Sequence, residues 1–293
     1  MSIFLDFDGT ITAQDTITHL SNFALGIRAS EGQDLKQQWS QVVKSYVDDH
    51  GNHVSSYVPH EDARSLPEHE VAFLRDLKTV EKRSLVRINA CALFRGIGDE
   101  AFRDAGRRLV EEGTVRLRDG FAEFVAKRRA EGWRVWVLSV NWSSAFIEGA
   151  CGGLEGVEVI SNDVREDGSI AGPGVLNTHL EDVRSCAVVG EQRNLTNSRD
   201  KLDAMEAVLA AEGLSTKPSV YFGDSTTDLE CLLAADRGYV ISDKDDSSLL
   251  ETLRRIGKEV PHVRDRDQST AGKLAWTSNY EDIAFPSYES ILR

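Results

Sequence analysis

Cysteine is scarce in this sequence of 293 residues: there are four, and no two form a C-x-x-C pair. Structural zinc sites usually take their thiolates from such close pairs, so we do not expect one here. We interpret Cys91, Cys151, Cys186 and Cys231 as reduced thiols. Long apolar runs are also missing. None approaches the roughly 20 residues that a helix needs to cross a bilayer, which argues against a membrane-spanning helix.

Basic residues are in deficit as well. The chain has 34 lysines and arginines against 48 aspartates and glutamates, a formal charge of −14. This balance argues against nucleic acid or an acidic membrane surface as a partner, because both attract a basic face. It does not exclude a small phosphorylated substrate, since a few local cations can bind one phosphate. The first expected strand begins at residue 3, which leaves no room for a signal or transit peptide, so we expect an intracellular, cytoplasmic protein.

The most informative stretch lies at the start of the chain. Residues 3–5 are all apolar, as in a strand buried on both faces of a parallel sheet, and they run directly into Asp6, Asp8 and Gly9. In open α/β sheets, ligands bind beyond the carboxyl ends of the strands. Asp6 and Asp8 are two residues apart, so on an extended backbone they lie on one side. Two such carboxylates suit a hard cation, or a nucleophile paired with an acid; an ordinary acidic turn is the alternative.

Residues 14–115 lack this strand pattern and are predicted to be mostly helical. Apolar residues recur at helical spacing after Asp15, over 35–47, and over three later stretches, 71–77, 85–94 and 100–109. The polar stretch 48–67 is predicted to be a loop. Its surroundings hold four histidines, for which a solvated loop is a better interpretation than a metal site: His50, His53, His60 and His69. About 100 helical residues inserted after one strand indicate a separate small domain.

Beyond this insertion, strands alternate with helices. Strands are expected at 133–138, 157–160, 219–222 and 239–241, and helices at 120–131, 143–149, 199–212 and 228–235, with a hairpin or loop at 163–174. The alternation predicts βαβ units and a parallel, doubly wound sheet. We therefore expect a discontinuous core, 1–13 and 116–293, that carries an inserted helical domain, 14–115. The stretch after residue 258 has no clear pattern.

Three further places carry polar groups that could act with the first acid pair. Ser139 follows the expected strand 133–138, Lys201 lies in the first turn of a helix, and Asp224 and Asp228 follow the strand 219–222. Each has an ordinary explanation when taken alone: a helix cap, a solvated lysine and a turn. Their order along the chain is more specific than any one of them.

Taken together, these motifs resemble the haloacid dehalogenase superfamily of phosphotransferases over nearly the whole chain. The matching residues are Asp6-Phe7-Asp8-Gly9-Thr10, Ser139, Lys201, and Gly223-Asp224 with Asp228. The pattern is most similar to the phosphoserine phosphatase branch and, within it, to the methylthiopentenyl-phosphate phosphatases and their fungal relatives. The resemblance implies a Rossmann-like α/β core with an inserted helical cap.

The resemblance also implies an activity, a Mg²⁺-dependent phosphomonoester hydrolase that acts on a small metabolite. Asp6 would attack phosphorus and form an aspartyl-phosphate, while Asp8 would protonate the leaving alcohol and then activate water. Mg²⁺ would be held by Asp6, the Asp8 carbonyl and Asp224, with Asp228 close by or one shell further out. The implied phosphate-binding residues are Ser139, Asn141 and Lys201.

Substrate choice is implied to lie with the cap. Asp15 is placed to face the leaving group, where an acid would favour hydroxyl or amino groups; the alternative is that it only caps a helix. Thr227 stands where phosphoserine phosphatases carry asparagine, and Arg75 and Arg87 are unassigned candidates for contacting a substrate carboxylate. Two other functions stay open: a phosphomutase or phosphotransferase on sugar phosphates, and a binding protein that kept the fold without turnover.

Overall fold

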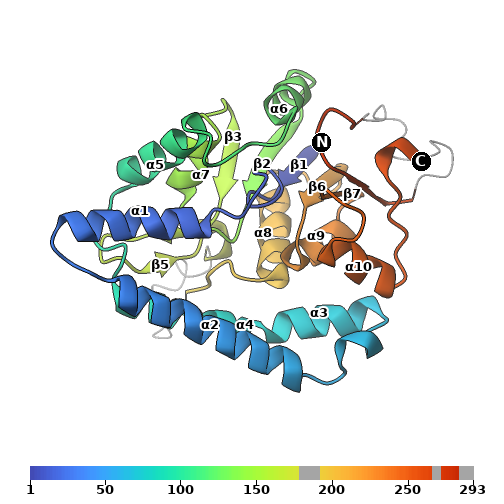
Figure 1. Ribbon diagram of the computed structural model, residues 1–293. Helices are drawn as coiled ribbons and strands as arrows, with labels where there is room; N and C mark the ends of the chain where they lie inside the picture. Colours follow the sequence, from blue (N-terminus) through green and yellow to red (C-terminus); the bar gives the residue numbers. More distant parts are fainter. Residues whose placement is uncertain (178–191, 266–271, 284–293) are drawn as a thin grey trace, which may run out of the picture.

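The computed structural model describes residues 1–177, 192–265 and 272–283. At its centre lies a six-stranded, entirely parallel sheet with the order β3-β2-β1-β6-β7-β8 (Figure 1). The strands are β1 (Ser2–Leu5), β2 (Arg134–Leu138), β3 (Val157–Ile160), β6 (Ser219–Gly223), β7 (Arg237–Ile241) and β8 (Leu274–Thr277). The predicted doubly wound parallel sheet is confirmed. The edge strand β8 lies in the stretch for which no element is predicted.

Helices cover both faces of the sheet, and the alternation of side chains along β1 shows how. Ile3 and Leu5 pack toward α6 (Phe121–Ala130) and α7 (Ser144–Ala150), whereas Phe4 packs toward the opposite layer. That layer consists of α8 (Ser198–Ala211), α9 (Leu229–Ala234) and α10 (Ser248–Arg255). Every residue of β1 is buried, and residues 3–5 are apolar on both faces of the sheet, as the sequence predicts.

The remaining elements of the described chain are short. The strands β4 (Asp163–Val164) and β5 (Ile170–Ala171) pair antiparallel, which confirms a hairpin in the stretch 163–174. Single 3-10 turns occur at Glu61–Ala63, Gly174–Leu176, Thr226–Asp228 and Val263–Asp265. The buried thiols Cys91, Cys151 and Cys231 are free, and Cys186 lies outside the described residues. No helix among the described residues combines the length and apolar character needed to cross a membrane.

Five α-helices lie within residues 14–115, the stretch that the sequence predicts to be mostly helical. They are α1 (Ile17–Ser30), α2 (Lys36–Ser56), α3 (Pro67–Asp76), α4 (Lys78–Cys91) and α5 (Asp99–Glu111). Helices α2, α3 and α4 form a layer away from the sheet (Figure 1), which we call the cap layer. Its treatment as a separate domain remains a prediction.

Helix α5 belongs spatially to the core, because it crosses α7 at very short range. A Cβ atom on Gly106 would lie 2.2 Å from the carbonyl oxygen of Phe146, and one on Gly149 would lie 1.9 Å from that of Arg103. Only glycine lets the two backbones approach this closely. The inserted segment is thus anchored to the core beside β2.

The predicted loop 48–67 is wrong in its first half, because α2 continues to Ser56. The polar composition hides this turn of helix from a search for apolar periodicity. One face is nevertheless packed: the His53 ring lies 5.6 Å from that of Phe73 on α3. Arg87 of α4 forms an ion pair with Asp49, which lies in the same part of α2 as His53. Tertiary contacts therefore extend the helix beyond what its own sequence indicates. Two of the four histidines, His50 and His53, lie on α2 rather than in a loop.

Ion pairs join the cap layer to the core helices at several points. A buried carboxylate takes part in each pair, and breaking one would remove a partner from a charge in a poorly hydrated site. The pairs are Glu70 with Arg255 of α10, Arg75 with Glu230 of α9, and Lys78 with Asp200 of α8. They hold α3 and the start of α4 over the carboxyl edge of the sheet.

Candidate active site

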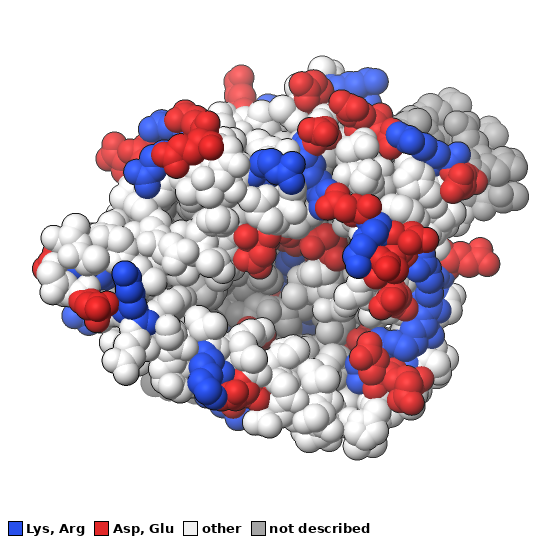
Figure 2. Space-filling model, in the orientation of Figure 1, with Lys and Arg blue, Asp and Glu red and all other residues white. Residues whose placement is uncertain are grey.

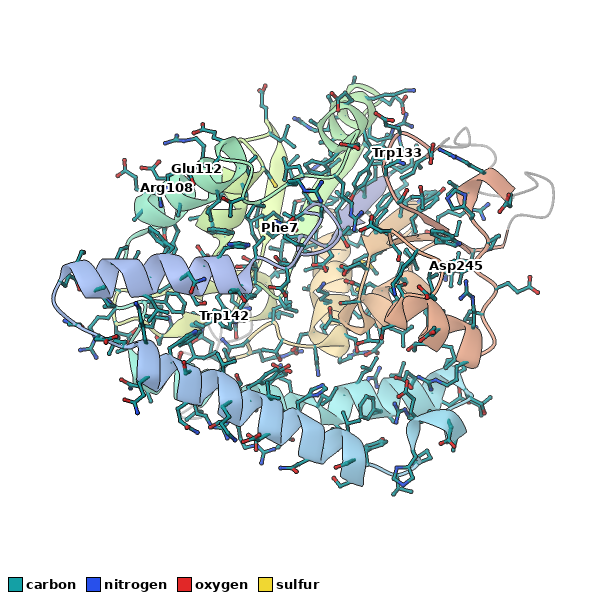
Figure 3. The ribbon with its side chains drawn as sticks, in the orientation of Figure 1. Phe7, Arg108, Glu112, Trp133, Trp142 and Asp245 are labelled. Carbon is teal, nitrogen blue, oxygen red and sulfur yellow. The ribbon has the colours of Figure 1, made fainter. Side chains whose placement is uncertain are left out.

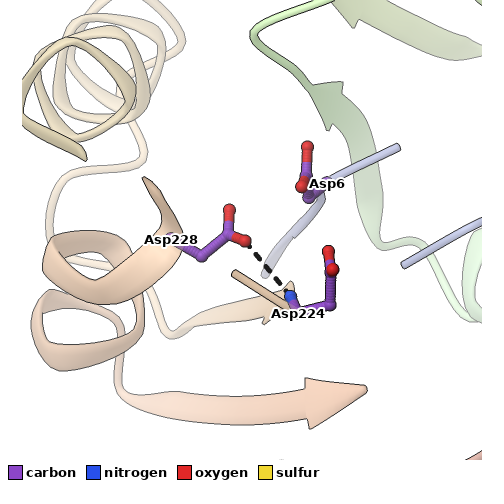
Figure 4. A group of neighbouring side chains, drawn as sticks. All are labelled: Asp6, Asp224 and Asp228. Carbon is purple, nitrogen blue, oxygen red and sulfur yellow. Dashed lines mark hydrogen bonds between the residues drawn. The ribbon is translucent and has the colours of Figure 1, made fainter. Parts of the chain in front are cut away.

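The acids that follow β1 and β6 lie side by side because these strands are neighbours in parallel register. Leu5 is opposite Phe222, and the Asp6 amide donates to the Phe222 carbonyl oxygen at 2.9 Å. Asp6 and Asp224 therefore leave the sheet at the same edge, and Asp228 follows a turn later (Figure 4). The two acidic motifs at the strand ends therefore lie next to each other in the structure.

Lys201 connects these acids. Its ammonium group lies 2.8 Å from Oδ1 of Asp6 and 2.6 Å from Oδ1 of Asp228, and its side chain is fully buried. Burial alone would lower the pKa of Lys201, but the two carboxylates outweigh it and raise the pKa above its ordinary value. Lys201 is thus a permanently charged group fixed between two acids.

Asp228 is the most firmly held of the acids. Its Oδ2 accepts hydrogen bonds from the amides of Asp224 and Ser225, both at 3.1 Å (Figure 4 draws the first). Its Oδ1 accepts one from the Tyr221 hydroxyl at 2.7 Å, in addition to Lys201. Sequence reasoning missed Tyr221. The signal that could have found it is a phenol within an otherwise apolar strand, since a buried hydroxyl needs a partner.

Three carboxylates form a group that suits a metal ion. Oxygens of Asp6, Asp224 and Asp228 lie within 4.8 Å of one another, and this is the one such group of acids, histidines and cysteines within the described residues. Burial, followed by repulsion from Asp228, raises the pKa of Asp6 well above its usual range and that of Asp224 to about 7. Lys201 alone leaves negative charge uncompensated, which fits the addition of a divalent cation with oxygen ligands.

The turn after β1 shapes this group. Gly9 has φ of +77°, and a Cβ there would lie 2.2 Å from Oδ2 of Asp224. The next residue, Thr10, donates its hydroxyl to the other oxygen of Asp224 at 2.9 Å. Gly9 and Thr10 of the first motif therefore set the position of an acid that belongs to the last one.

Asp8 is not part of this group and has partners of its own. Its Oδ1 accepts from the amide of Thr16 at 2.7 Å and from the Thr16 hydroxyl at 2.5 Å. Its Oδ2 accepts from the amide nitrogen of Asn141 at 2.9 Å. Burial, with the nearby charge of Asp15, raises the pKa of Asp8 to about 6 against the effect of these hydrogen bonds. A carboxyl group of this kind can both donate and accept a proton near neutral pH.

The other predicted phosphate ligands follow the neighbouring strand β2. Ser139 is fully buried, and its Oγ accepts from the amide of Asn141 at 3.1 Å. The side-chain amide of Asn141 is engaged with Asp8 and, at 3.2 Å, with the Thr16 hydroxyl. The structure thus brings Ser139, Asn141 and Lys201 to the same edge as the acids, while their phosphate-binding roles remain predictions.

A cavity of about 630 Å³ lies between α1, α2, α4 and the segment after β2. In Figure 2 the molecule is hollowed between its upper part and α2, and Figure 3 places Trp142 between α1 and α2. Asp15 lines this cavity, while its carboxylate also accepts from the Ile17 amide at 2.8 Å at the start of α1. The N-cap of α1 is Thr16, so Asp15 precedes the cap position that the sequence predicts for it, and its role toward a substrate remains a prediction.

Sequence reasoning missed two further residues of this cavity. Glu81 of α4 lines it and accepts a hydrogen bond from the hydroxyl of Tyr46 of α2 at 3.0 Å. Burial raises the pKa of Glu81 to about 7. Neither residue belongs to a motif, and each is one polar position among many on its helix, so only the packing of α2 on α4 singles them out.

Residues 3–233 match the haloacid dehalogenase-like hydrolase family, and the chain therefore belongs to this family. Its predicted membership and its class as a hydrolase are confirmed. Among curated proteins, the chain is similar to the mitochondrial bifunctional TH2 protein of Arabidopsis thaliana, with 26% identity over 87% of this chain but only 40% of that protein. It is also similar to cold tolerance protein 1 of Saccharomyces cerevisiae, with 28% identity over 79% of this chain and 75% of that protein.

Solved structures share the fold. A Bordetella pertussis protein of unknown function aligns with a TM-score of 0.53 and 17% identity, over 88% of this chain and 96% of that one. A phosphoserine phosphatase, solved as an analogue of its phospho-aspartyl intermediate, aligns with a TM-score of 0.45 and 14% identity over 88% of this chain and 91% of that one. At 17% identity the Bordetella pertussis structure shows a shared fold and identifies no substrate.

Proposed function

We propose that this protein is a Mg²⁺-dependent phosphatase that hydrolyses a small phosphomonoester through an aspartyl-phosphate on Asp6. The observation that carries the proposal is the arrangement around Asp6. Its carboxylate is buried at a strand end, Lys201 is 2.8 Å away, and a second carboxyl, Asp8, follows two residues later with separate hydrogen-bond partners. A nucleophile, a fixed cation and an acid with a raised pKa are the parts that phosphoryl transfer needs.

In the first half of the reaction, a carboxylate oxygen of Asp6 attacks phosphorus, and the bond from phosphorus to the alcohol oxygen breaks. Protonated Asp8 gives its proton to that oxygen, so that a neutral alcohol leaves. Lys201 and the hydroxyl of Ser139 are proposed to bind the phosphoryl oxygens, and the charge on Lys201 favours the transition state.

In the second half, a water attacks the phosphorus of the aspartyl-phosphate, and Asp8 takes its proton. Inorganic phosphate forms and the Asp6 carboxylate is regenerated. Thr16 and Asn141 hold Asp8 in one orientation through both halves, because they bind its two oxygens separately. A Mg²⁺ ion held by Asp6, Asp224 and the Asp8 carbonyl, with Asp228 beside them, would neutralise the charge of acids and phosphate.

The test is release of inorganic phosphate from a panel of phosphomonoesters by the wild-type chain and by Asp6→Asn. The amide has nearly the same shape and leaves Lys201 paired with Asp228, so the variant should fold, with an unchanged circular dichroism spectrum. Its kcat should fall at least a hundredfold, which corresponds to about 2.7 kcal/mol of lost transition-state stabilisation. A hydroxylamine-labile phosphate label should form on wild type and not on Asp6→Asn.

A variant that kept more than about one hundredth of wild-type kcat would overturn Asp6 as the nucleophile. Transfer of phosphate between sugar hydroxyls without release of inorganic phosphate would identify a mutase. No turnover of any ester by the Mg²⁺-loaded wild type would support a binding protein.

A further inference from the structure

The 630 Å³ cavity lies next to the residues that hold Asp8, although Asp8 is not among its lining residues. Thr16 and Asn141 both donate to the Asp8 carboxylate, and the chain neighbours of each, on both sides, line the cavity. In the proposed reaction Asp8 protonates the leaving oxygen. The alcohol part of the substrate must therefore lie on the Asp8 side, and this cavity is the space available for it.

The charges that line the cavity have one sign. Among the described residues, its lining includes two acids, Asp15 and Glu81, and no lysine, arginine or histidine. Lys78, one turn before Glu81, is not a lining residue. Its ammonium group donates to the Asn194 carbonyl at 2.9 Å, to Asp200, and to the hydroxyl of Thr196 at the margin of the cavity at 3.0 Å, so its charge is already paired. A positively charged ligand would gain the attraction of both acids, and an anionic tail would be repelled.

The walls of the cavity are aromatic. The rings of Trp39 and Trp142 both line it, with centroids 6.1 Å apart and planes at 84°. Phe94 contacts both rings from behind, with centroids at 6.3 and 5.9 Å, and so fixes their orientation. Indole faces attract cations and offer broad contact to a flat ring. The site therefore combines an aromatic corner with two carboxylates.

The arginines that could contact a substrate carboxylate lie elsewhere. Arg75 forms an ion pair with Glu230, and Arg87 forms one with Asp49. Neither lines this cavity. An amino-acid phosphate would place its carboxylate near Asp15 and Glu81 with no compensating cation among the described lining residues. This chemistry disfavours phosphoserine as the substrate.

We propose that the cavity selects phosphomonoesters whose alcohol part is a flat ring with a cationic nitrogen, with Glu81 and Asp15 facing the charge and Trp39 and Trp142 contacting the ring. The inference rests on the proposed function, because it assigns the leaving-group side of that reaction. It adds Glu81, on the cap layer, as the residue that determines specificity. Tyr46 orients the Glu81 carboxylate through its hydrogen bond.

The test uses two esters of similar shape, (1-methylpyridinium-3-yl)methyl phosphate and benzyl phosphate, which differ in charge and by one methyl group. Their ratio of kcat/KM includes a difference in leaving-group reactivity, so the informative quantity is the change of this ratio between proteins. Relative to wild type, Glu81→Gln should lower the ratio about tenfold and Asp15→Asn about threefold. Turnover of benzyl phosphate reports the part of each change that is common to both esters, including the effect of Asp15 on the pKa of Asp8. Glu68→Gln, an exposed acid of α3 outside the cavity, is the matched control and should leave the ratio unchanged.

A second measurement needs no turnover. The pyridinium alcohol alone should quench tryptophan fluorescence saturably in wild type, more weakly in Trp142→Phe and Glu81→Gln, while benzyl alcohol should bind less tightly. Hydrolysis with an unchanged ratio and unchanged quenching in Glu81→Gln would overturn the inference and leave the proposed function standing. Binding that depends on Glu81, without hydrolysis of any ester, would support the cavity assignment and overturn the phosphatase. Absence of hydrolysis and of binding would overturn the proposed function and the cavity assignment alike.

Discussion

Replacing Glu81 with glutamine should make the protein more stable at pH 8, although it removes a charge from the candidate substrate pocket. Burial raises the pKa of Glu81 from 4.5 to about 7, against the effects of the Tyr46 hydrogen bond and Lys78. Between these two values the folded chain binds more protons than the unfolded chain at this site. Wild-type stability from this group is therefore complete below pH 4.5 and is lost as pH rises through 7.

The size of the effect follows from the shift. Each pKa unit corresponds to about 1.4 kcal/mol, so full burial would cost about 3 kcal/mol at pH 8. Because Glu81 retains some exposure, we expect roughly 1–2 kcal/mol, or about 2–6 °C in Tm. Glutamine cannot ionise and can still accept the hydrogen bond from Tyr46, so the variant avoids this cost.

The assay is urea unfolding of wild type, Glu81→Gln and Glu68→Gln at pH 4.5, 6 and 8. Taking differences between proteins cancels every other titrating group. The gap between Glu81→Gln and wild type should be near zero at pH 4.5 and widen toward pH 8, while Glu68→Gln follows wild type. A gap that does not depend on pH, or a variant less stable than wild type at pH 8, would refute the reasoning.

Three further outcomes are expected. Tyr221→Phe removes a hydrogen-bond donor from Asp228, so kcat should fall several-fold and the free energy of unfolding by about 1 kcal/mol. Equal kinetics in the variant and the wild type would exclude a positioning role for the hydroxyl. Gly9→Ala should abolish turnover because the added Cβ would meet the Asp224 carboxylate. The control Gly113→Ala has a similar φ but open space around it, and should cost only about 1 kcal/mol of stability. Equal activity of the two variants would contradict this reasoning. Chelation should abolish phosphate release and added Mg²⁺ restore it, and full activity in protein shown by elemental analysis to be metal-free would exclude the metal role.

The catalytic edge could be predicted from sequence because its geometry is local. A buried apolar strand that runs into an acid fixes where that acid leaves the sheet, and parallel neighbours share that edge, so Asp6 and Asp224 had to meet once β1 and β6 were adjacent. The partners of Lys201 are different. They depend on how α8 packs over the sheet, and a lysine in the first turn of a helix is solvated in most proteins.

The residues of the substrate cavity could not be predicted either, because they too depend on how helices pack. Glu81 and Tyr46 lie on different helices, and their meeting depends on the packing of α2 against α4. The end of α2 was hidden as well, because its stability comes from contacts such as that of His53 with Phe73. Periodicity detects the apolar face of a helix, and it cannot identify which polar position another helix will cover.

The position of β1 has a consequence for how the protein is made. This strand lies in the interior of the sheet, yet it pairs with β2 and with β6, whose residues emerge from the ribosome much later. At about 5–20 residues per second, roughly 200 residues separate β1 from β6, a delay of about 10–40 s. Until β6 has been made, β1 can pair with β2 alone, and its other edge has no strand partner. Fragments that stop before β6 should therefore aggregate or be degraded more readily than the whole chain, because β1 keeps an unpaired edge.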